Sequence, residues 1–140
     1  MAQDDDPSGP EGRDEAARRH CLHVAASAYF EALRTGRLTD VPWHHDVTLR
    51  TPIASGGAEQ PITGEDDVRA FFEAIAPAVE TVTILARYPA EDLSSIAVRA
   101  DIHLSEPPCV LRVVDCFDVD GTGCITSQEN HFDPRPAVGS

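Results

Sequence analysis

One acidic side chain, Asp115, interrupts a run of apolar residues whose spacing is typical of a β-strand. It shares a strand face with the apolar residues that alternate along the same segment, namely Leu111, Val113, Phe117 and Val119. If this face packs against a core, burial without a partner favours the protonated carboxyl group and raises its pKa. A neutral carboxylic acid can donate a hydrogen bond or a proton in an enclosed site. A solvent-exposed strand end, or an ion pair with an arginine, is the alternative interpretation.

A tyrosine on a predicted helix offers a second polar group. Residues 14–35 hold no proline or glycine, and their apolar residues recur at helical spacing. The apolar face of this helix comprises Leu22, Ala25 or Ala26, Tyr29 and Leu33. A buried tyrosine needs a hydrogen-bond partner, so Tyr29 could present its hydroxyl to a ligand oxygen. A core tyrosine whose hydroxyl reaches water is the alternative interpretation.

The histidines and cysteines predict neither a metal site nor a disulfide framework. His20 and His23 lie three residues apart on the helix, but the spacing suggests no third ligand. His44 and His45 follow Trp43 in a short loop or helix and are expected on the surface. The four cysteines form no Cys-x-x-Cys pair, which predicts free thiols. The chain also lacks nucleotide-binding and nucleophile-elbow motifs, so we expect no metal and no cofactor.

The charge balance limits the classes of partner. The chain has 24 acidic and 11 basic residues and a formal net charge of −13. Such a chain should repel phosphate backbones and anionic lipids, which predicts no nucleic-acid partner and no membrane partner. All basic residues are arginines, so Schiff-base chemistry on a lysine is excluded. No apolar run approaches the ~20 residues needed to span a bilayer, and the polar start does not read as a signal peptide, so we expect a cytoplasmic location.

The pattern along the chain predicts one domain. Residues 1–13 read as a disordered acidic tail, residues 14–134 as the folded domain and residues 135–140 as a disordered C-terminus. After Pro77 the apolar period changes from 3.6 to 2. The predicted helices come before most of the predicted strands along the chain. This order predicts an α+β domain, in which the helices pack on one face of a mostly antiparallel sheet.

Local signals predict where several elements begin and end. A short helix is expected from Thr39 or Asp40, and a strand over residues 47–53 holds Pro52, which suits an edge strand. Residues 63–66 read as a variant capping box before the next helix. Residues 120–123, with the sequence Asp-Gly-Thr-Gly, predict a hairpin turn between the last two strands.

The order of these elements resembles the nuclear transport factor 2-like superfamily, which includes ketosteroid isomerases, limonene epoxide hydrolases and SnoaL-like polyketide cyclases. The resemblance covers about residues 16–134. The segments that carry it are Ala28–Leu33 with Gly36 and Leu38, Trp43–Pro52, Ile62–Gly64 with Val68, Phe71 and Phe72, then Val113–Phe117, Gly123–Ile125 and His131–Pro134. It implies a cone-shaped fold whose curved sheet encloses a pocket.

The same resemblance implies roles for single residues. Tyr29 falls where ketosteroid isomerases keep an oxyanion-hole tyrosine, and Asp115 falls where they keep a protonated aspartate. The SnoaL-like cyclases place an acid/base aspartate at about the same position as Asp115. Thr51 stands where the isomerases have their general base, and it cannot take a proton near neutral pH. The implied substrate-binding residues are Thr51, Phe72, Val98, Leu111, Val113, Gln128, Asn130 and Phe132.

Two functions of different class stay open. The first is an enzyme that isomerises, cyclises or dehydrates a small apolar, oxygenated molecule by acid/base chemistry, as in natural-product biosynthesis. The second is a protein of the same fold that binds such a molecule without turnover. The pair Tyr29 and Asp115 favours the enzyme, whereas Thr51 at the position of the base favours the binding protein.

The opposite face of the predicted sheet suggests an interface. Val110, Val114 and Cys116 alternate with the inward residues of their strand and leave apolar surface there. Polar residues that could border this surface are Arg99, Asp101 and Arg112. With the family resemblance, this pattern predicts a homodimer.

Overall fold

The computed structural model describes residues 10–138, and of Pro10 and Glu11 only the backbone. Helix α1 spans Pro10–Thr35, so it begins four residues before the predicted start and includes part of the expected disordered tail. Proline suits the first turn of a helix, where its missing N–H leaves no bond unmade. The short helix α3 (Arg135–Val138) likewise lies where disorder was expected. The predictions for residues 1–9 and 139–140 fall outside the described residues.

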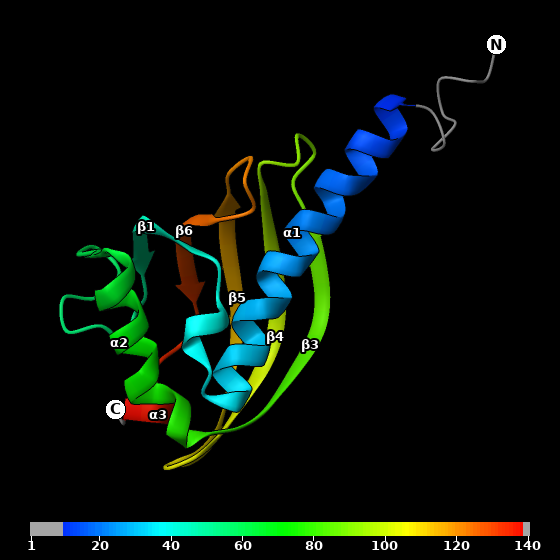
Figure 1. The fold of residues 1–140 in the computed structure, drawn as a ribbon. Coiled ribbons are helices and arrows are strands. Elements are labelled where there is room, and N and C mark those ends of the chain that lie inside the picture. The colour runs from blue at the N-terminus through cyan, green and yellow to red at the C-terminus, as the bar shows by residue number, and fades with distance from the viewer. Residues whose placement is uncertain (1–9, 139–140) are drawn as a thin grey trace.

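A six-stranded sheet forms the body of the molecule, in the order β2-β1-β6-β5-β4-β3. Its strands are β1 (Trp43–Arg50), β2 (Ile62–Thr63), β3 (Val79–Pro89), β4 (Ser95–Ser105), β5 (Pro108–Val119) and β6 (Ile125–His131). All neighbouring strands are antiparallel except β1 and β6, which are parallel. Helix α1 and helix α2 (Glu65–Ile75) lie on the same side of the sheet, which curves around α1 (Figure 1). The predicted α+β class and the mostly antiparallel sheet are therefore confirmed.

Three local predictions differ from the structure. Strand β1 ends at Arg50, ahead of Pro52, and it lies between β2 and β6 rather than at the sheet edge. The predicted capping box is wrong, because Gly64 precedes α2 with a φ of 99° and no side chain caps the helix. The predicted short helix is a 3-10 turn over Leu38–Asp40, and a second 3-10 turn (Ala76–Ala78) follows α2.

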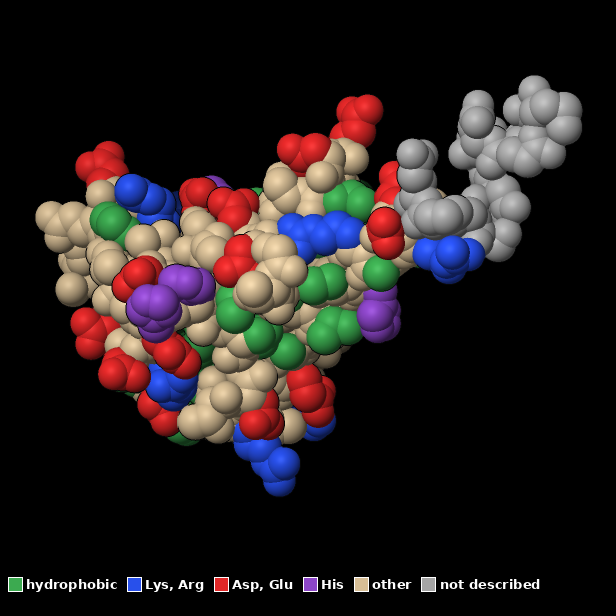
Figure 2. All heavy atoms as spheres, turned by 45° about the horizontal axis from the view of Figure 1, so that its top comes forward, with side chains coloured by type: hydrophobic (Ala, Val, Ile, Leu, Met, Phe, Trp, Pro, Cys, Tyr) green, Lys and Arg blue, Asp and Glu red, His purple; other side chains and the backbone are tan. Residues whose placement is uncertain are grey.

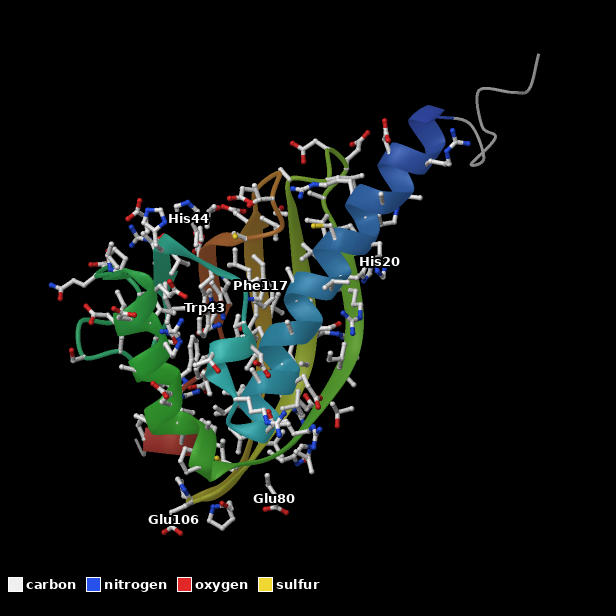
Figure 3. The ribbon with its side chains drawn as sticks, viewed as in Figure 1. His20, Trp43, His44, Glu80, Glu106 and Phe117 are labelled. Atoms are coloured by element: carbon white, nitrogen blue, oxygen red, sulfur yellow. The ribbon has the colours of Figure 1, made fainter. Side chains whose placement is uncertain are left out.

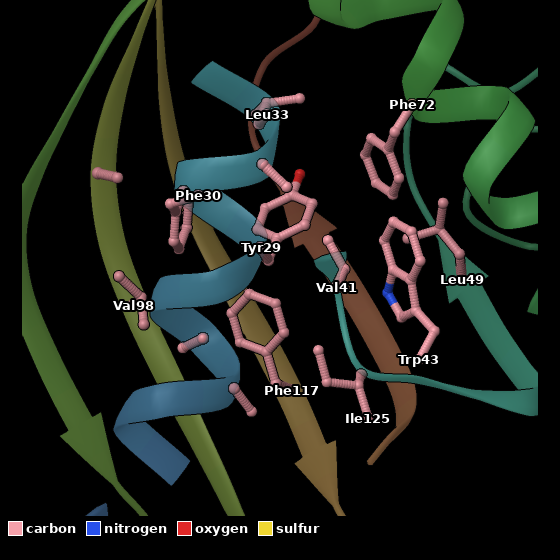
Figure 4. Packing of buried hydrophobic residues seen from close by; sticks show 14 of the residues in the cluster. Tyr29, Phe30, Leu33, Val41, Trp43, Leu49, Phe72, Val98, Phe117 and Ile125 are labelled. Carbon is pink, nitrogen blue, oxygen red and sulfur yellow. The ribbon is translucent and has the colours of Figure 1, made fainter. Parts of the chain in front are cut away.

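The core lies between the helices and the concave face of the sheet. In β5 the buried residues alternate with more exposed ones, as the period of two predicts. The aromatic rings at the centre come from separate elements: Tyr29 and Phe30 from α1, Trp43 from β1, Phe72 from α2 and Phe117 from β5 (Figure 4). This cluster sets the distance between α1, α2 and the sheet, and so shapes the space that the sheet encloses.

The surface carries the acidic excess. Asp and Glu side chains are spread over the face seen in Figure 2, with hydrophobic side chains exposed between them. Among the described residues, no helix is both long and apolar enough to cross a bilayer.

Candidate ligand-binding and active site

A pocket opens between the helices and the concave face of the sheet. Its cavity volume, counted as the space open to the centre of a water-sized sphere, is about 40 Å³, and it is open to solvent at its mouth. Its walls are mostly aliphatic and aromatic, and four polar side chains reach it: Tyr29, Thr51, Asp115 and Asn130. A mostly apolar pocket with a few convergent polar groups is the usual form of a small-molecule site.

Asp115 is the acidic side chain of this pocket. It lies in β5, directly between Val98 of β4 and Asn130 of β6 in the sheet register. Only 2% of its surface is exposed, and its Oδ1 has no hydrogen-bond partner among the described residues. Burial raises the pKa of this carboxyl to about 7, and the facing amide of Asn130 acts in the opposite direction. Near neutral pH, a large fraction of the protein therefore carries a protonated Asp115.

Tyr29 reaches the pocket from helix α1. Its ring makes edge-to-face contacts with Phe30 at 4.9 Å and with Phe72 at 5.1 Å between ring centres. Burial raises the pKa of its hydroxyl well above the ordinary value, and the charge on nearby Asp115 adds to this effect. The hydroxyl therefore keeps its proton across the physiological range and can donate it in a hydrogen bond.

Thr51 and Asn130 contribute further buried polar atoms to the pocket. Thr51 is 1% exposed and Asn130 is 5% exposed. Neither Oγ1 of Thr51 nor Nδ2 of Asn130 has a hydrogen-bond partner among the described residues. Unpaired buried polar atoms are unfavourable and rare, so several of them around one pocket indicate a place for a ligand or for ordered water.

The structure brings together most of the residues that the sequence pointed to. Those that line the pocket are Tyr29, Thr51, Phe72, Leu111, Val113, Asp115, Asn130 and Phe132. Val98 and Gln128 do not line it, contrary to expectation, although both are completely buried. Val98 packs in the core, and the Oε1 atom of Gln128 accepts a hydrogen bond from the indole Nε1 of Trp43 at 3.0 Å.

Further apolar residues complete the walls and were not predicted: Leu33, Ile53, Phe71, Ile75, Ile102 and Leu104. The apolar periods of α1, α2 and β4 place several of them on inward faces, so that signal was available in the sequence. Ile53 carries no such signal, because it lies in the irregular segment after β1 and its position depends on the tertiary fold.

A separate group of possible metal ligands lies on the surface. One ligand atom each of His44, His45 and Asp46 lies within 4.8 Å of the others. Consecutive residues meet there because the pairing of β1 with β6 is irregular between Trp43 and Thr48. His44 lies at the surface, whereas the labelled Trp43 is in the interior (Figure 3). The absence of a bound metal stays a prediction.

The fold is shared with solved structures, although no protein-family model and no curated sequence matches the chain. RV0760c from Mycobacterium tuberculosis, in complex with estradiol-17beta-hemisuccinate, superposes with a TM-score of 0.70 at 18% identity, over 83% of this chain and 96% of that one. A steroid delta-isomerase from Pseudomonas aeruginosa gives 0.65 at 16% identity, over 84% and 83%.

An NTF2-like protein of unknown function from Cytophaga hutchinsonii gives a TM-score of 0.64 at 15% identity, over 82% of this chain and 92% of that one. These similarities cover nearly the whole domain. The chain therefore has the cone-shaped nuclear transport factor 2-like fold, as its sequence predicted.

Proposed function

We propose that this protein binds a small apolar molecule bearing a carbonyl or hydroxyl oxygen and acts on it by acid/base chemistry. The observation that carries the proposal is a buried Asp115, with its pKa raised to about 7, in an apolar pocket that Tyr29 also lines. Proteins of the same fold support the choice of ligand. One is described with a bound estradiol ester, one is a steroid delta-isomerase and one is a computationally designed 17-OHP binder.

The chemistry follows from two donors that converge on one oxygen. Neutral Asp115 and Tyr29 can both donate hydrogen bonds to a carbonyl oxygen. These bonds strengthen as negative charge develops on that oxygen during enolisation, because the mostly apolar walls of the pocket lower the local dielectric constant. An acid with a pKa of about 7 is also suited to proton transfer near neutral pH.

Isomerisation, aldol-type cyclisation and dehydration of a ketone all need such carbonyl activation. We accordingly place the activity among isomerases, cyclases and dehydratases, with natural-product biosynthesis in the cytoplasm as the setting that the SnoaL-like resemblance suggests.

Binding without turnover is the second candidate, and one observation favours it. Among the lining residues, Asp115 and Tyr29 are the ones that can exchange a proton; Tyr29 keeps its proton, and Asp115 has no second acidic or basic side chain beside it in the pocket. Thr51 lies in the pocket but cannot act as a base. A pocket without a separate base can hold a ketone and leave it unchanged.

Deuterium exchange on a simple ketone separates the two candidates. 1-Tetralone is a bicyclic ketone with exchangeable hydrogens beside its carbonyl, and tetralin is the hydrocarbon with the same skeleton. For an enzyme, we expect the protein to bind 1-tetralone more tightly than tetralin and to accelerate its exchange in D₂O. Asp115→Asn should keep binding and lower the exchange rate by ~10²–10⁴.

The outcomes are distinct. Tight binding of 1-tetralone with exchange at the buffer rate would assign the protein to the binding class. Exchange that is as fast in Asp115→Asn as in the natural protein would remove Asp115 from the acid/base role. Equal affinity for 1-tetralone and tetralin would contradict a pocket that recognises oxygen.

A further inference from the structure

A buried polar pair behind the pocket, Trp43 and Gln128, has no part in the chemistry described above. The two residues lie on β1 and β6, which run parallel to each other. Indole Nε1 of Trp43 donates to Oε1 of Gln128 at 3.0 Å, and the side chains are 4% and 0% exposed. A fully buried amide is unfavourable unless its polar atoms are bonded, so Gln128 requires a physical reason for its place in the core.

The indole determines which way the Gln128 amide is turned. An indole N–H only donates, so the amide must present its oxygen to Trp43 and its NH₂ group to the other side. Nε2 of Gln128 has no hydrogen-bond partner among the described residues. The pair therefore holds one buried donor in a fixed orientation.

Tyr29 is a neighbour of this pair in the core. The rings of Tyr29 and Trp43 lie edge to face, 6.4 Å apart between their centres (Figure 4). Burial is the main influence that raises the pKa of Tyr29, the charge of Asp115 adds to it, and the side chains of Gln128 and Asn130 act against it. That direction is expected for an N–H that faces the phenol oxygen, because a donor favours the phenolate form.

We propose that Trp43 and Gln128 form a positioning relay that directs the hydroxyl proton of Tyr29 toward the oxygen of a ligand in the pocket. In this relay, the free Nε2 of Gln128 turns a hydrogen toward the phenol oxygen, so that Tyr29 places its own proton on another acceptor. The acceptors on the pocket side are a ligand oxygen, the carboxyl group of Asp115, the hydroxyl of Thr51 and the amide oxygen of Asn130. Hydrogen bonds in such a chain polarise one another, so the relay makes Tyr29 a better donor.

The relay rests on the proposed function, since it requires a ligand oxygen at Tyr29. It also adds a consequence for specificity. The preference for an oxygen-bearing ligand over a hydrocarbon depends on Trp43 and Gln128, although neither residue lines the pocket.

The composition of the chain allows a direct spectroscopic test. Trp43 is the single tryptophan, and Tyr29 and Tyr88 are the two tyrosines. Tyr88 is 53% exposed, so a Tyr88→Phe parent protein should fold normally and show one tyrosine ¹³Cζ resonance and one indole N–H resonance. Gln128→Leu in this parent should shift both resonances, because each group loses its neighbour.

Two further variants complete the comparison. Trp43→Phe frees the Gln128 amide to turn and should also shift the Tyr29 resonance. Ile96→Val is the matched control, because Ile96 is buried but pairs with Pro89 and Phe117, outside the relay. It should leave the tyrosine resonance within the small range expected for a core substitution.

Ligand affinity provides the functional measurement. The ratio of the dissociation constants of tetralin and 1-tetralone reports how much the ketone oxygen contributes. Gln128→Leu and Trp43→Phe should each lower this ratio by on the order of tenfold, the effect of one well-directed hydrogen bond. Tetralin affinity should not change, and a merely structural role for the pair would alter both ligands alike.

Failure of the relay and failure of the proposed function give different results. If the parent prefers 1-tetralone and the folded variants keep that preference, or keep the tyrosine resonance, the relay is refuted while the proposed function stands. If the parent shows no preference for the ketone, the proposed function fails, and the relay fails with it. Should a single variant not fold, the double variant Trp43→Phe with Gln128→Leu replaces both polar partners by apolar groups and is judged by the same ratio.

Discussion

At the scale of single residues, burial has different consequences for the two polar groups that meet in the pocket. It raises the pKa of both, but Tyr29 starts near 10 and Asp115 near 3.8, so Asp115 alone is brought into the physiological range, to about 7. Tyr29 is consequently a permanent donor, whereas Asp115 changes between donor and anion near neutral pH. From this difference we propose that Tyr29 acts by hydrogen bonding and Asp115 by proton transfer.

The raised pKa of Asp115 predicts a particular pH dependence of stability. The folded protein binds this proton up to about pH 7, whereas an unfolded aspartate releases it near ~3.9. Between these values the free energy of unfolding should decrease as the pH rises, because the folded state holds a proton that the unfolded state has lost. The decrease is on the order of 4 kcal/mol at ~1.4 kcal/mol per pH unit, and it is complete above ~pH 7.

Urea unfolding of the natural protein and of Asp115→Asn at a series of pH values measures this contribution. Asp115→Asn should be the more stable of the two at pH 8, and the difference should shrink toward pH 4 as Asp115 becomes protonated in both states. A difference that does not vary between pH 4 and pH 8 would show that Asp115 does not titrate in that range.

At the scale of elements, helix α1 is tied to the turns at one end of the sheet by Arg18. Its Nε donates to the carbonyl oxygen of Leu93 at 2.8 Å, and its Nη1 donates to that of Asp120 at the same distance. The other nitrogen, Nη2, donates to the carbonyl oxygen of Val119. One guanidinium group thus holds α1, which carries Tyr29, against the β3–β4 and β5–β6 connections.

Loss of these bonds should weaken the fold. Arg18→Met keeps the apolar stem but removes the donors, and we expect the free energy of unfolding to fall by ~1–3 kcal/mol. Arg19→Met is the control, because Arg19 is exposed and its ion pair with Glu15 is 3.8 Å long; it should change stability by less than ~0.5 kcal/mol. Equal effects of the two substitutions in urea unfolding would contradict this role for Arg18.

The sequence predicted those elements whose signals are local. The alternation in β4 and β5 is a property of neighbouring residues, and it predicted that Asp115 shares a face with the apolar residues of β5. The parallel pairing of β1 with β6 joins segments far apart in the chain, so no local pattern reveals it. The hydrogen bond between Gln128 and Trp43 could not be predicted for the same reason, because it joins two strands that are far apart in the chain. The family resemblance predicted only that Gln128 points inward.

At the scale of the whole molecule, the outer face of the sheet is the surface on which we propose a homodimer. Val110 and Val114 are 39% and 38% exposed there, and Val114 lies between Arg99 and His131 in the sheet register. Apolar surface bordered by charged and polar groups is typical of a protein interface. A net charge of −13 on each protomer opposes association, so salt should strengthen the dimer by screening that repulsion.

Val114→Glu should convert the dimer to monomer in sedimentation experiments at tens of micromolar protein and leave 1-tetralone affinity unchanged, since Val114 does not line the pocket. Val24→Glu is the matched control, because Val24 is 50% exposed on α1, away from this face. A natural protein that sediments as a monomer at this concentration would refute the proposed dimer.

A protonated carboxylic acid inside an apolar pocket is the central claim for the whole protein, and an NMR titration of the Asp115 side-chain carboxyl carbon tests it most directly. Asp115→Asn identifies the resonance by its disappearance. We predict a pKa of about 7 in the free protein, caused by burial. Saturation with 1-tetralone should raise this pKa further, because a bound ketone accepts a hydrogen bond from the protonated form and excludes water. A pKa at or below ~3.9, unaltered by the ketone, would contradict the account.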